Sequence, residues 1–178
     1  MADERKGAVT LRGNPLTLGG PELKPGQSAP DFTVLDNALK PVRLAEAKGK
    51  VVILSSVPSL DTPTCDTETR RFNQEAAKLG EGVEVWTISR DLPFAQKRWC
   101  GAAGVTSVKT LSDFRARVFG PAYGVEIKDG PIAGLTARAV FVVGKDGTLR
   151  HVEYVKEIAS EPNYEAALAA AKAAAQGG

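Results

Sequence analysis

The stretch SSVPSLDTPTCD, residues 55–66, joins a predicted strand to a predicted helix. The four residues before it, VVIL at 51–54, are typical of a buried strand. Asp61 or Thr62 can cap a helix that begins with the adjacent proline. Cys65 then lies about three residues into the helix, where unpaired backbone N–H groups and the positive end of the helix dipole favour a thiolate. The stretch therefore predicts a nucleophilic cysteine at a strand-to-helix turn.

The predicted helix has one apolar face, and the cysteine lies on it. Residues of this face recur at intervals of seven, four and three: Cys65, Phe72, Ala76 and Leu79. We therefore expect the thiol to be partly sheltered at the edge of the core. Asp66 and Glu68 would add negative charge beside the sulfur and disfavour the thiolate, so a cation must come from a distant segment. The alternative is that Cys65 is only a small buried hydrophobe.

The pattern Pro58-x-x-x-Thr62-x-x-Cys65 resembles the peroxidatic motif of the peroxiredoxins. The longer run 57–73 is similar to the thiol peroxidase subfamily of bacteria. Four more blocks extend the resemblance along nearly the whole chain: DLPFAQKRWC at 91–100, LSD at 111–113, GLTARAVFV at 134–142 and EPNYEAAL at 161–168. A pattern with three fixed residues is weak by itself, whereas several ordered blocks in one chain are specific.

This resemblance implies a thioredoxin-dependent peroxidase and a role for each site residue. Cys65 would be the peroxidatic nucleophile, and Thr62 would bring its hydroxyl over the same turn. Pro58 would shield the sulfur from water, and Arg138 would supply the missing cation. Cys100 would be the resolving cysteine and form an intramolecular Cys65–Cys100 disulfide that thioredoxin reduces, as in atypical 2-Cys peroxiredoxins. The implied substrates are hydrogen peroxide and alkyl hydroperoxides, and the implied assembly is a homodimer.

Strands alternate with helices along the chain, followed by a hairpin and a last helix. This order predicts an α/β fold with a mixed central sheet flanked by helices; a thioredoxin-like fold fits it, as the resemblance implies independently. Two short alternating runs around Gly13-Asn14 predict an N-terminal β-hairpin at about 8–18. Asp91 is expected to cap the helix that carries Cys100. That helix is expected to stop directly after Cys100, because Gly101 and Gly104 both permit the left-handed turn that ends helices. Further strands are predicted at 32–35, 42–44, 83–89, 108–111, 137–143 and 148–155, and further helices at 114–119 and 163–175.

Length and composition fit one domain spanning residues 1–178. Two cysteines are too few for a secreted disulfide scaffold, and with the one histidine, His151, they make no Cys/His zinc set. The net charge is +2, from 23 basic and 21 acidic residues, so nucleic acid is not an expected partner. The first six residues lack the apolar stretch of a signal peptide, and no run approaches the ~20 apolar residues of a membrane span. We therefore expect a cytoplasmic protein with no membrane partner, bound metal or cofactor.

Three alternatives remain at the level of the sequence. A thiol–disulfide exchange protein of thioredoxin type predicts Cys-x-x-Cys, but Glu68 stands at the second cysteine position. In a non-enzymatic redox sensor, the same two cysteines would become oxidised without catalytic turnover. If both thiols were only structural, they would neither be oxidised in a functional step nor support turnover. From its position alone, Arg138 could equally be a surface ion-pair partner.

Overall fold

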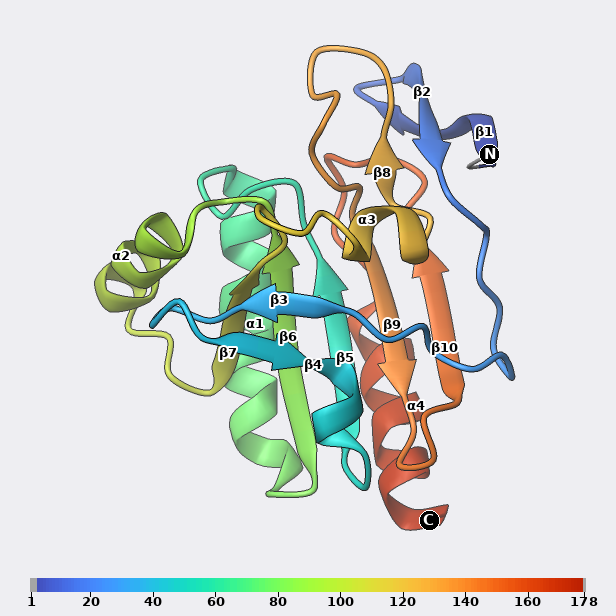
Figure 1. Cartoon of the computed structure of the whole chain (residues 1–178). Coiled ribbons are helices and arrows are strands. Elements are labelled where there is room, and N and C mark those ends of the chain that lie inside the picture. Colours follow the sequence, from blue (N-terminus) through green and yellow to red (C-terminus); the bar gives the residue numbers. More distant parts are fainter. Residues whose placement is uncertain (1–2, 178) are drawn as a thin grey trace.

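A seven-stranded mixed sheet forms the centre of the computed structural model, which describes residues 3–177 (Figure 1). The strand order is β10-β9-β5-β6-β7-β3-β4, with bounds, in that order, of Leu149–Tyr154, Ala139–Val143, Val51–Ser56, Val83–Ser89, Val108–Ser112, Thr33–Leu35 and Pro41–Arg43. β5, β6 and β7 are parallel, and the other neighbours pair antiparallel. The predicted α/β class with a mixed central sheet is confirmed.

Each face of this sheet carries its own hydrophobic core, because alternate strand residues point to opposite faces. The helices are α1 (Pro63–Leu79), α2 (Pro93–Ala103), α3 (Phe119–Ala122) and α4 (Tyr164–Gly177), with a short 3₁₀ helix η1 at Leu44–Ala47. Val51 and Ile53 of β5 belong to the core that α1 and α4 cover, and both helices lie behind the sheet in Figure 1. Val52 and Leu54 belong to the core on the opposite face.

The predicted N-terminal hairpin is present and is longer than expected. Strands β1 (Glu4–Leu11) and β2 (Asn14–Gly19) pair antiparallel, and β2 also pairs with β8 (Glu126–Ile127) in a second, three-stranded sheet. Leu11 pairs with Asn14, so the turn residues are Arg12 and Gly13 instead of Gly13-Asn14. Both have positive φ, 50° and 83°, as a tight hairpin turn requires. Figure 1 shows this small sheet beyond one end of the main sheet.

Two helix boundaries differ from the prediction. α2 runs on through Gly101 and ends at Gly104, which has the left-handed φ of 68°, so Cys100 lies in the last turn of the helix. The predicted helix at 114–119 is wrong, because α3 begins only at Phe119. Asp113 accounts for this shift, since its carboxylate accepts hydrogen bonds from the backbone N–H of Phe119 at 3.1 Å and holds the preceding residues in a turn. The remaining predicted strands and the terminal helix agree to within a few residues.

The fold brings several strand ends to one edge of the main sheet. β5, β6 and β7 are parallel, so their carboxyl ends meet there. β9 runs the opposite way and starts at the same edge, where Ala139 pairs with Ser56. Loops at this edge are the usual place for a reactive site in an open α/β sheet. Among residues 3–177, no helix is both long and apolar enough to cross a membrane.

Candidate active site

Cys65 lies in the first turn of α1, directly beyond the carboxyl end of β5. Its side chain is fully buried, at 0% exposure, and it packs in the same core as Phe72 of α1. The predicted position on the apolar face is therefore confirmed, although the thiol is more deeply buried than expected. Because the helix begins at Pro63, the sulfur sits where the dipole and the unpaired N–H groups favour negative charge.

Arg138 is the cation closest in space to this thiol among the contacts of the described residues. It directly precedes β9, is almost completely buried, and its Nη2 lies 3.2 Å from the Cys65 Sγ. Its Nε donates to the Ile158 carbonyl at 2.8 Å, and its Nη1 donates to the Glu68 carboxylate. Three hydrogen bonds in different directions thus fix the guanidinium beside the sulfur. The surface ion-pair alternative for Arg138 is wrong.

Glu68 belongs to the site, and Arg138 is the distant cation that its negative charge was expected to require. Its carboxylate is completely buried, pairs with Arg138 and accepts a hydrogen bond from the Ser55 hydroxyl at 2.8 Å. Burial raises the pKa of Glu68 from 4.5 to about 7, against the opposing effect of Arg138. Burial by itself lowers the pKa of Arg138, but Glu68 and Cys65 outweigh it and the pKa rises. Glu68 therefore anchors Arg138 and is not simply a repulsive charge.

A signal for this role is present in the sequence. Glu68 follows Cys65 by three residues, which places both on the same buried face of the helix. An acidic residue on an apolar face requires a buried partner of opposite charge. That requirement would have pointed to a buried basic residue elsewhere in the chain.

Pro58, Thr62 and Arg138 line one pocket of about 540 Å³ at this edge of the sheet. Thr62 occupies the N-cap position of α1, but its hydroxyl donates to the Ser59 carbonyl at 3.0 Å and does not cap the helix. The N-terminal hairpin and three later segments complete the wall: Leu11, Arg12, Asn14, Pro63, Thr64, Pro131, Ile132, Leu135, Ile158 and Ala159. Most of these side chains are apolar, so the pocket can accept a hydrocarbon group next to the buried Arg138.

The loop before α1 is held by Asp91, which was expected to cap α2. No side chain caps α2, whose N-cap residue is Leu92. The Asp91 carboxylate instead accepts hydrogen bonds from the Ser59 hydroxyl at 2.7 Å and the Leu60 N–H at 2.8 Å. It also accepts one from the Ser89 hydroxyl at 2.7 Å. Asp91 thus fastens the loop that carries Pro58 and Thr62 to the end of β6.

Cys100 lies outside the pocket that contains Pro58, Thr62 and Arg138. Its thiol is 3.2 Å from the Thr110 hydroxyl of β7 and 4.0 Å from the Asn37 amide nitrogen. It lines a separate hollow of about 420 Å³ with these two residues. Both cysteines are free thiols. The structure therefore shows the dithiol form, in which the two sulfurs have different partners.

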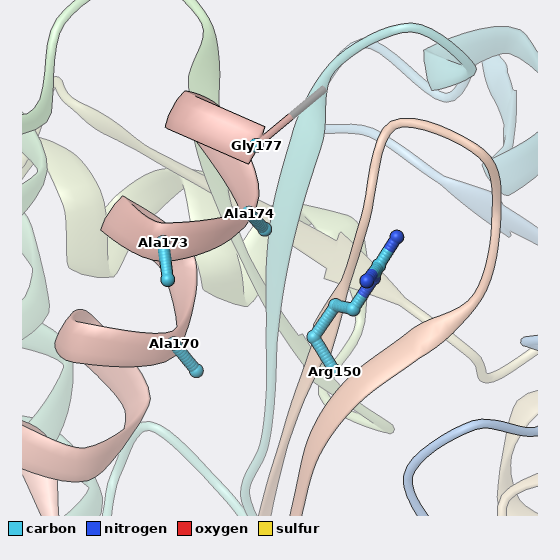
Figure 2. Close-up of a pocket in the computed structure, with 5 residues that line it drawn as sticks. All are labelled: Arg150, Ala170, Ala173, Ala174 and Gly177. Carbon is cyan, nitrogen blue, oxygen red and sulfur yellow. The ribbon is translucent and has the colours of Figure 1, made fainter.

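The hollow beside the C-terminal helix offers no comparable chemistry. Figure 2 shows a hollow between the end of α4 and the β9–β10 hairpin, lined by Arg150, Ala170, Ala173, Ala174 and Gly177. These alanines carry no reactive group, and Arg150 pairs with Asp146 at 3.2 Å. Residues 3–177 contain no cluster of three His, Cys, Asp or Glu side chains that could hold a metal ion.

Comparison with known proteins identifies the family. The profile of the Redoxin family matches residues 24–168, which is most of the chain. The chain belongs to the redoxin family. The thiol peroxidase of Bacillus subtilis (strain 168) is 56% identical over 93% of this redoxin and 96% of its own length. The thiol peroxidase of Halalkalibacterium halodurans is also 56% identical, over 94% of this redoxin and 98% of its own length. The resemblance of this redoxin to the bacterial thiol peroxidases is therefore confirmed.

Solved structures agree with this family. A peroxiredoxin-like protein from Aquifex aeolicus superposes with a TM-score of 0.89 and 45% identity, over 96% of this redoxin and 97% of that chain. A thiol peroxidase from Chromobacterium violaceum superposes with a TM-score of 0.81 over 89% and 91%. At 19% identity this second likeness shows the fold alone. Together they confirm the predicted thioredoxin-like fold.

Proposed function

We propose that this redoxin reduces hydrogen peroxide and organic hydroperoxides with Cys65 as the peroxidatic nucleophile. The observation that carries the proposal is the contact of 3.2 Å between Arg138 Nη2 and Cys65 Sγ. The thiolate attacks the terminal peroxide oxygen, the O–O bond breaks, and water or an alcohol leaves. The sulfur becomes a sulfenic acid. Arg138 stays charged throughout and donates to the thiolate and to the oxygen on which negative charge develops.

Pro58 and Thr62 shape the route by which the peroxide reaches the buried sulfur. Both line the pocket beside Arg138, and the proline has no N–H with which to hold water there. The Thr62 hydroxyl can rotate from the Ser59 carbonyl and donate to a peroxide oxygen, because a hydroxyl rotates to suit its partner. The apolar wall of the pocket supports alkyl hydroperoxides as substrates alongside hydrogen peroxide.

Cys100 resolves the sulfenic acid. Its thiolate attacks the Cys65 sulfur, an S–S bond forms, and the hydroxyl of the sulfenic acid leaves and is released as water. The Cα atoms of a disulfide lie no more than ~7 Å apart, whereas the Cys100 thiol contacts Thr110 and the Cys65 thiol contacts Arg138. We therefore propose that the first turn of α1 and the last turn of α2 unwind. The dithiol of thioredoxin then reduces the disulfide by exchange.

A homodimer in the cytoplasm is the expected setting for this cycle. Leu92 and Phe94, at the start of α2, are 51% and 67% exposed, and large exposed apolar side chains favour association. A second copy covering them would support the dimer. Light scattering at micromolar concentration measures the assembly directly; a single species of 18.8 kDa would contradict it.

Peroxide consumption with thioredoxin, thioredoxin reductase and NADPH tests the proposed function. The unmodified chain should turn over hydrogen peroxide and an alkyl hydroperoxide, and Cys65→Ser should consume neither. The matched control is Thr69→Ser, which introduces a serine at another buried position, one turn after Cys65 in α1. This variant should keep turnover. Peroxide consumption by Cys65→Ser at the unmodified rate would contradict the assignment. Oxidation of the unmodified chain without turnover would support the redox-sensor alternative.

A further inference from the structure

A hydrogen bond joins the two helices that carry the cysteines. The Trp99 indole Nε1 donates to the Asp66 carboxylate at 2.8 Å. Asp66 directly follows Cys65 in α1, and Trp99 directly precedes Cys100 in α2. The indole is 8% exposed and belongs to the same core as Cys65. The immediate neighbours of the two cysteines are thus fastened to one another in the dithiol form.

Arg70 strengthens this connection from the next turn of α1. Its Nε donates to the second Asp66 oxygen at 2.8 Å, and its Nη1 donates to the Ala103 carbonyl at 3.3 Å. Its guanidinium carbon also lies 5.7 Å from the centre of the Trp99 ring, within the range of a cation–π contact. α1 therefore holds α2 on both sides of Cys100, at Trp99 and at Ala103.

These contacts decide where the Cys100 thiol points. Consecutive residues of an α-helix are about 100° apart around its axis. While the Trp99 indole is bound to Asp66, the Cys100 side chain therefore points in a different direction, along the same core, and its sulfur contacts Thr110 of β7. The Cys100 thiol contacts Thr110 and the Cys65 thiol contacts Arg138, so a disulfide requires both sulfurs to leave these partners. If the ends of α1 and α2 unwind for this step, the contact between Trp99 and Asp66 breaks with them.

We propose that Asp66, Arg70 and Trp99 form a clasp whose opening limits the formation of the Cys65–Cys100 disulfide. This inference rests on the proposed function, because it assumes that Cys100 resolves the Cys65 sulfenic acid. The three residues are positioning residues, since none of them contacts a reacting sulfur. The clasp fixes how long the sulfenic acid persists and hence how much of it a second peroxide can convert to sulfinic acid.

The energetics give the direction and size of the effect. A hydrogen bond to a charged group is stronger than one between neutral groups, and losing it should raise the population of the open form about tenfold. Disulfide formation should accelerate by the same factor. The clasp stabilises the dithiol form, because it is lost when both helix ends unwind. A substitution that removes the clasp therefore also shifts the equilibrium from the dithiol toward the disulfide. A tenfold shift lowers the reduction potential by about 30 mV.

The first test replaces Trp99 by Phe, which removes the donor and keeps an aromatic ring. After rapid mixing with one equivalent of hydrogen peroxide, acid quenching and mass spectrometry follow the sulfenic acid and the disulfide separately. Trp99→Phe should form the disulfide about tenfold faster, while Cys65 oxidises at the unmodified rate. The matched control is Trp86→Phe. It removes the hydrogen bond of 3.2 Å from the Trp86 indole to Glu84, which is not part of the clasp, and it should change neither rate.

A second variant guards against a fold effect at Trp99. Arg70 is about half exposed, so Arg70→Gln should leave the core intact and still weaken the clasp. Arg71→Gln, the next residue on the same helix, contacts Glu75 in its own helix at 3.8 Å and serves as its control. Because Arg70 and Trp99 both bind Asp66, the effects of the two substitutions on the disulfide rate should be less than multiplicative.

Trp86→Phe also leaves Trp99 as the one remaining tryptophan of the chain. Its fluorescence should change in step with the disulfide and not with the sulfenic acid. The clasp would be overturned if Trp99→Phe and Arg70→Gln formed the disulfide no faster than the unmodified chain. It would also be overturned if these variants accelerated Cys65 oxidation by the same factor as disulfide formation. If the unmodified chain forms no Cys65–Cys100 disulfide at all, the proposed function fails first and the clasp fails with it.

Discussion

The guanidinium of Arg138 lies 3.2 Å from the sulfur of Cys65, although 73 positions separate the two residues. Strand register produces this contact. Ser56, the last residue of β5, pairs with Ala139, the first residue of β9, so Arg138 emerges beside the loop that leads into α1. A slip of one residue would turn the arginine to the other face of the sheet. The contact between Arg138 and Cys65 therefore depends on the pairing of two central strands.

Replacement of Arg138 by Ala should reduce the rate of Cys65 oxidation, because it removes the donor that lies 3.2 Å from the sulfur. Removing one preorganised donor to a developing charge typically costs about 100-fold in rate. Stopped-flow oxidation measures this effect. The control is Arg43→Ala, which removes an exposed ion pair with Asp31 and should leave the rate unchanged. An unchanged oxidation rate in Arg138→Ala would show that the contact is only structural.

Glu68 should make the stability of the fold fall as the pH rises from about 4.5 to 7. Burial raises the pKa of Glu68 to about 7 in the folded chain, so the folded state binds a proton that the unfolded state has already lost. Over this window the free energy of unfolding should fall by on the order of 3 kcal/mol from this group. Urea unfolding at a series of pH values measures it.

The matched variant for that measurement is Glu68→Gln, which keeps the shape of the side chain but does not titrate. The difference in unfolding free energy between the two proteins should change across the same pH window. A difference that stays constant from pH 4.5 to pH 7 would mean that Glu68 titrates at its ordinary value in the folded chain.

Loss of the Asp91 carboxylate should loosen the loop that carries Pro58 and Thr62. Asp91→Ala removes three hydrogen-bond acceptor contacts, which should cost about 1–3 kcal/mol of stability and slow Cys65 oxidation. Asp61→Ala in the same loop is the control, because Asp61 is largely exposed and only approaches Arg98 at 3.8 Å. Equal oxidation rates in the two variants would contradict a positioning role for Asp91.

Cys100→Ser should separate the two halves of the cycle. Its first turnover should proceed at the unmodified rate, because Cys100 has no contact with the pocket beside Arg138. Recycling by thioredoxin should be lost, since no intramolecular disulfide can form. A burst of one equivalent of peroxide followed by no further consumption is the expected trace. Continuous turnover of Cys100→Ser at the unmodified rate would remove the resolving role from Cys100.

Local patterns in the sequence were enough to predict the strand-to-helix turn, the position of Cys65 and the α/β class. Each depends on short-range periodicity or on helix-end chemistry, which neighbouring residues determine. The need for a distant cation also followed from local charge. Its identity as Arg138 came from the resemblance to a family, because spacing alone left a surface ion pair equally acceptable.

What the sequence did not reveal was set by contacts between distant segments. The sequence indicated that Glu68 needs a compensating cation, but not that Glu68 itself binds it, because its partner Arg138 lies 70 positions away. Asp91 had the sequence signature of a helix cap, but the hydroxyl of Ser59 and the N–H of Leu60, from another segment, bind its carboxylate instead. Similarly, the end of α2 depended on which of two glycines adopts the left-handed conformation, and Gly104 does so.

The most direct test of the account is a free-thiol count with peptide mapping after one equivalent of hydrogen peroxide. Both thiols, free in the dithiol form, should disappear within seconds, and a peptide linking Cys65 to Cys100 should appear. Two free thiols after several minutes would contradict the central claim that Arg138 and the start of α1 activate Cys65. Loss of the Cys65 thiol alone would contradict the assignment of Cys100 as its resolving partner.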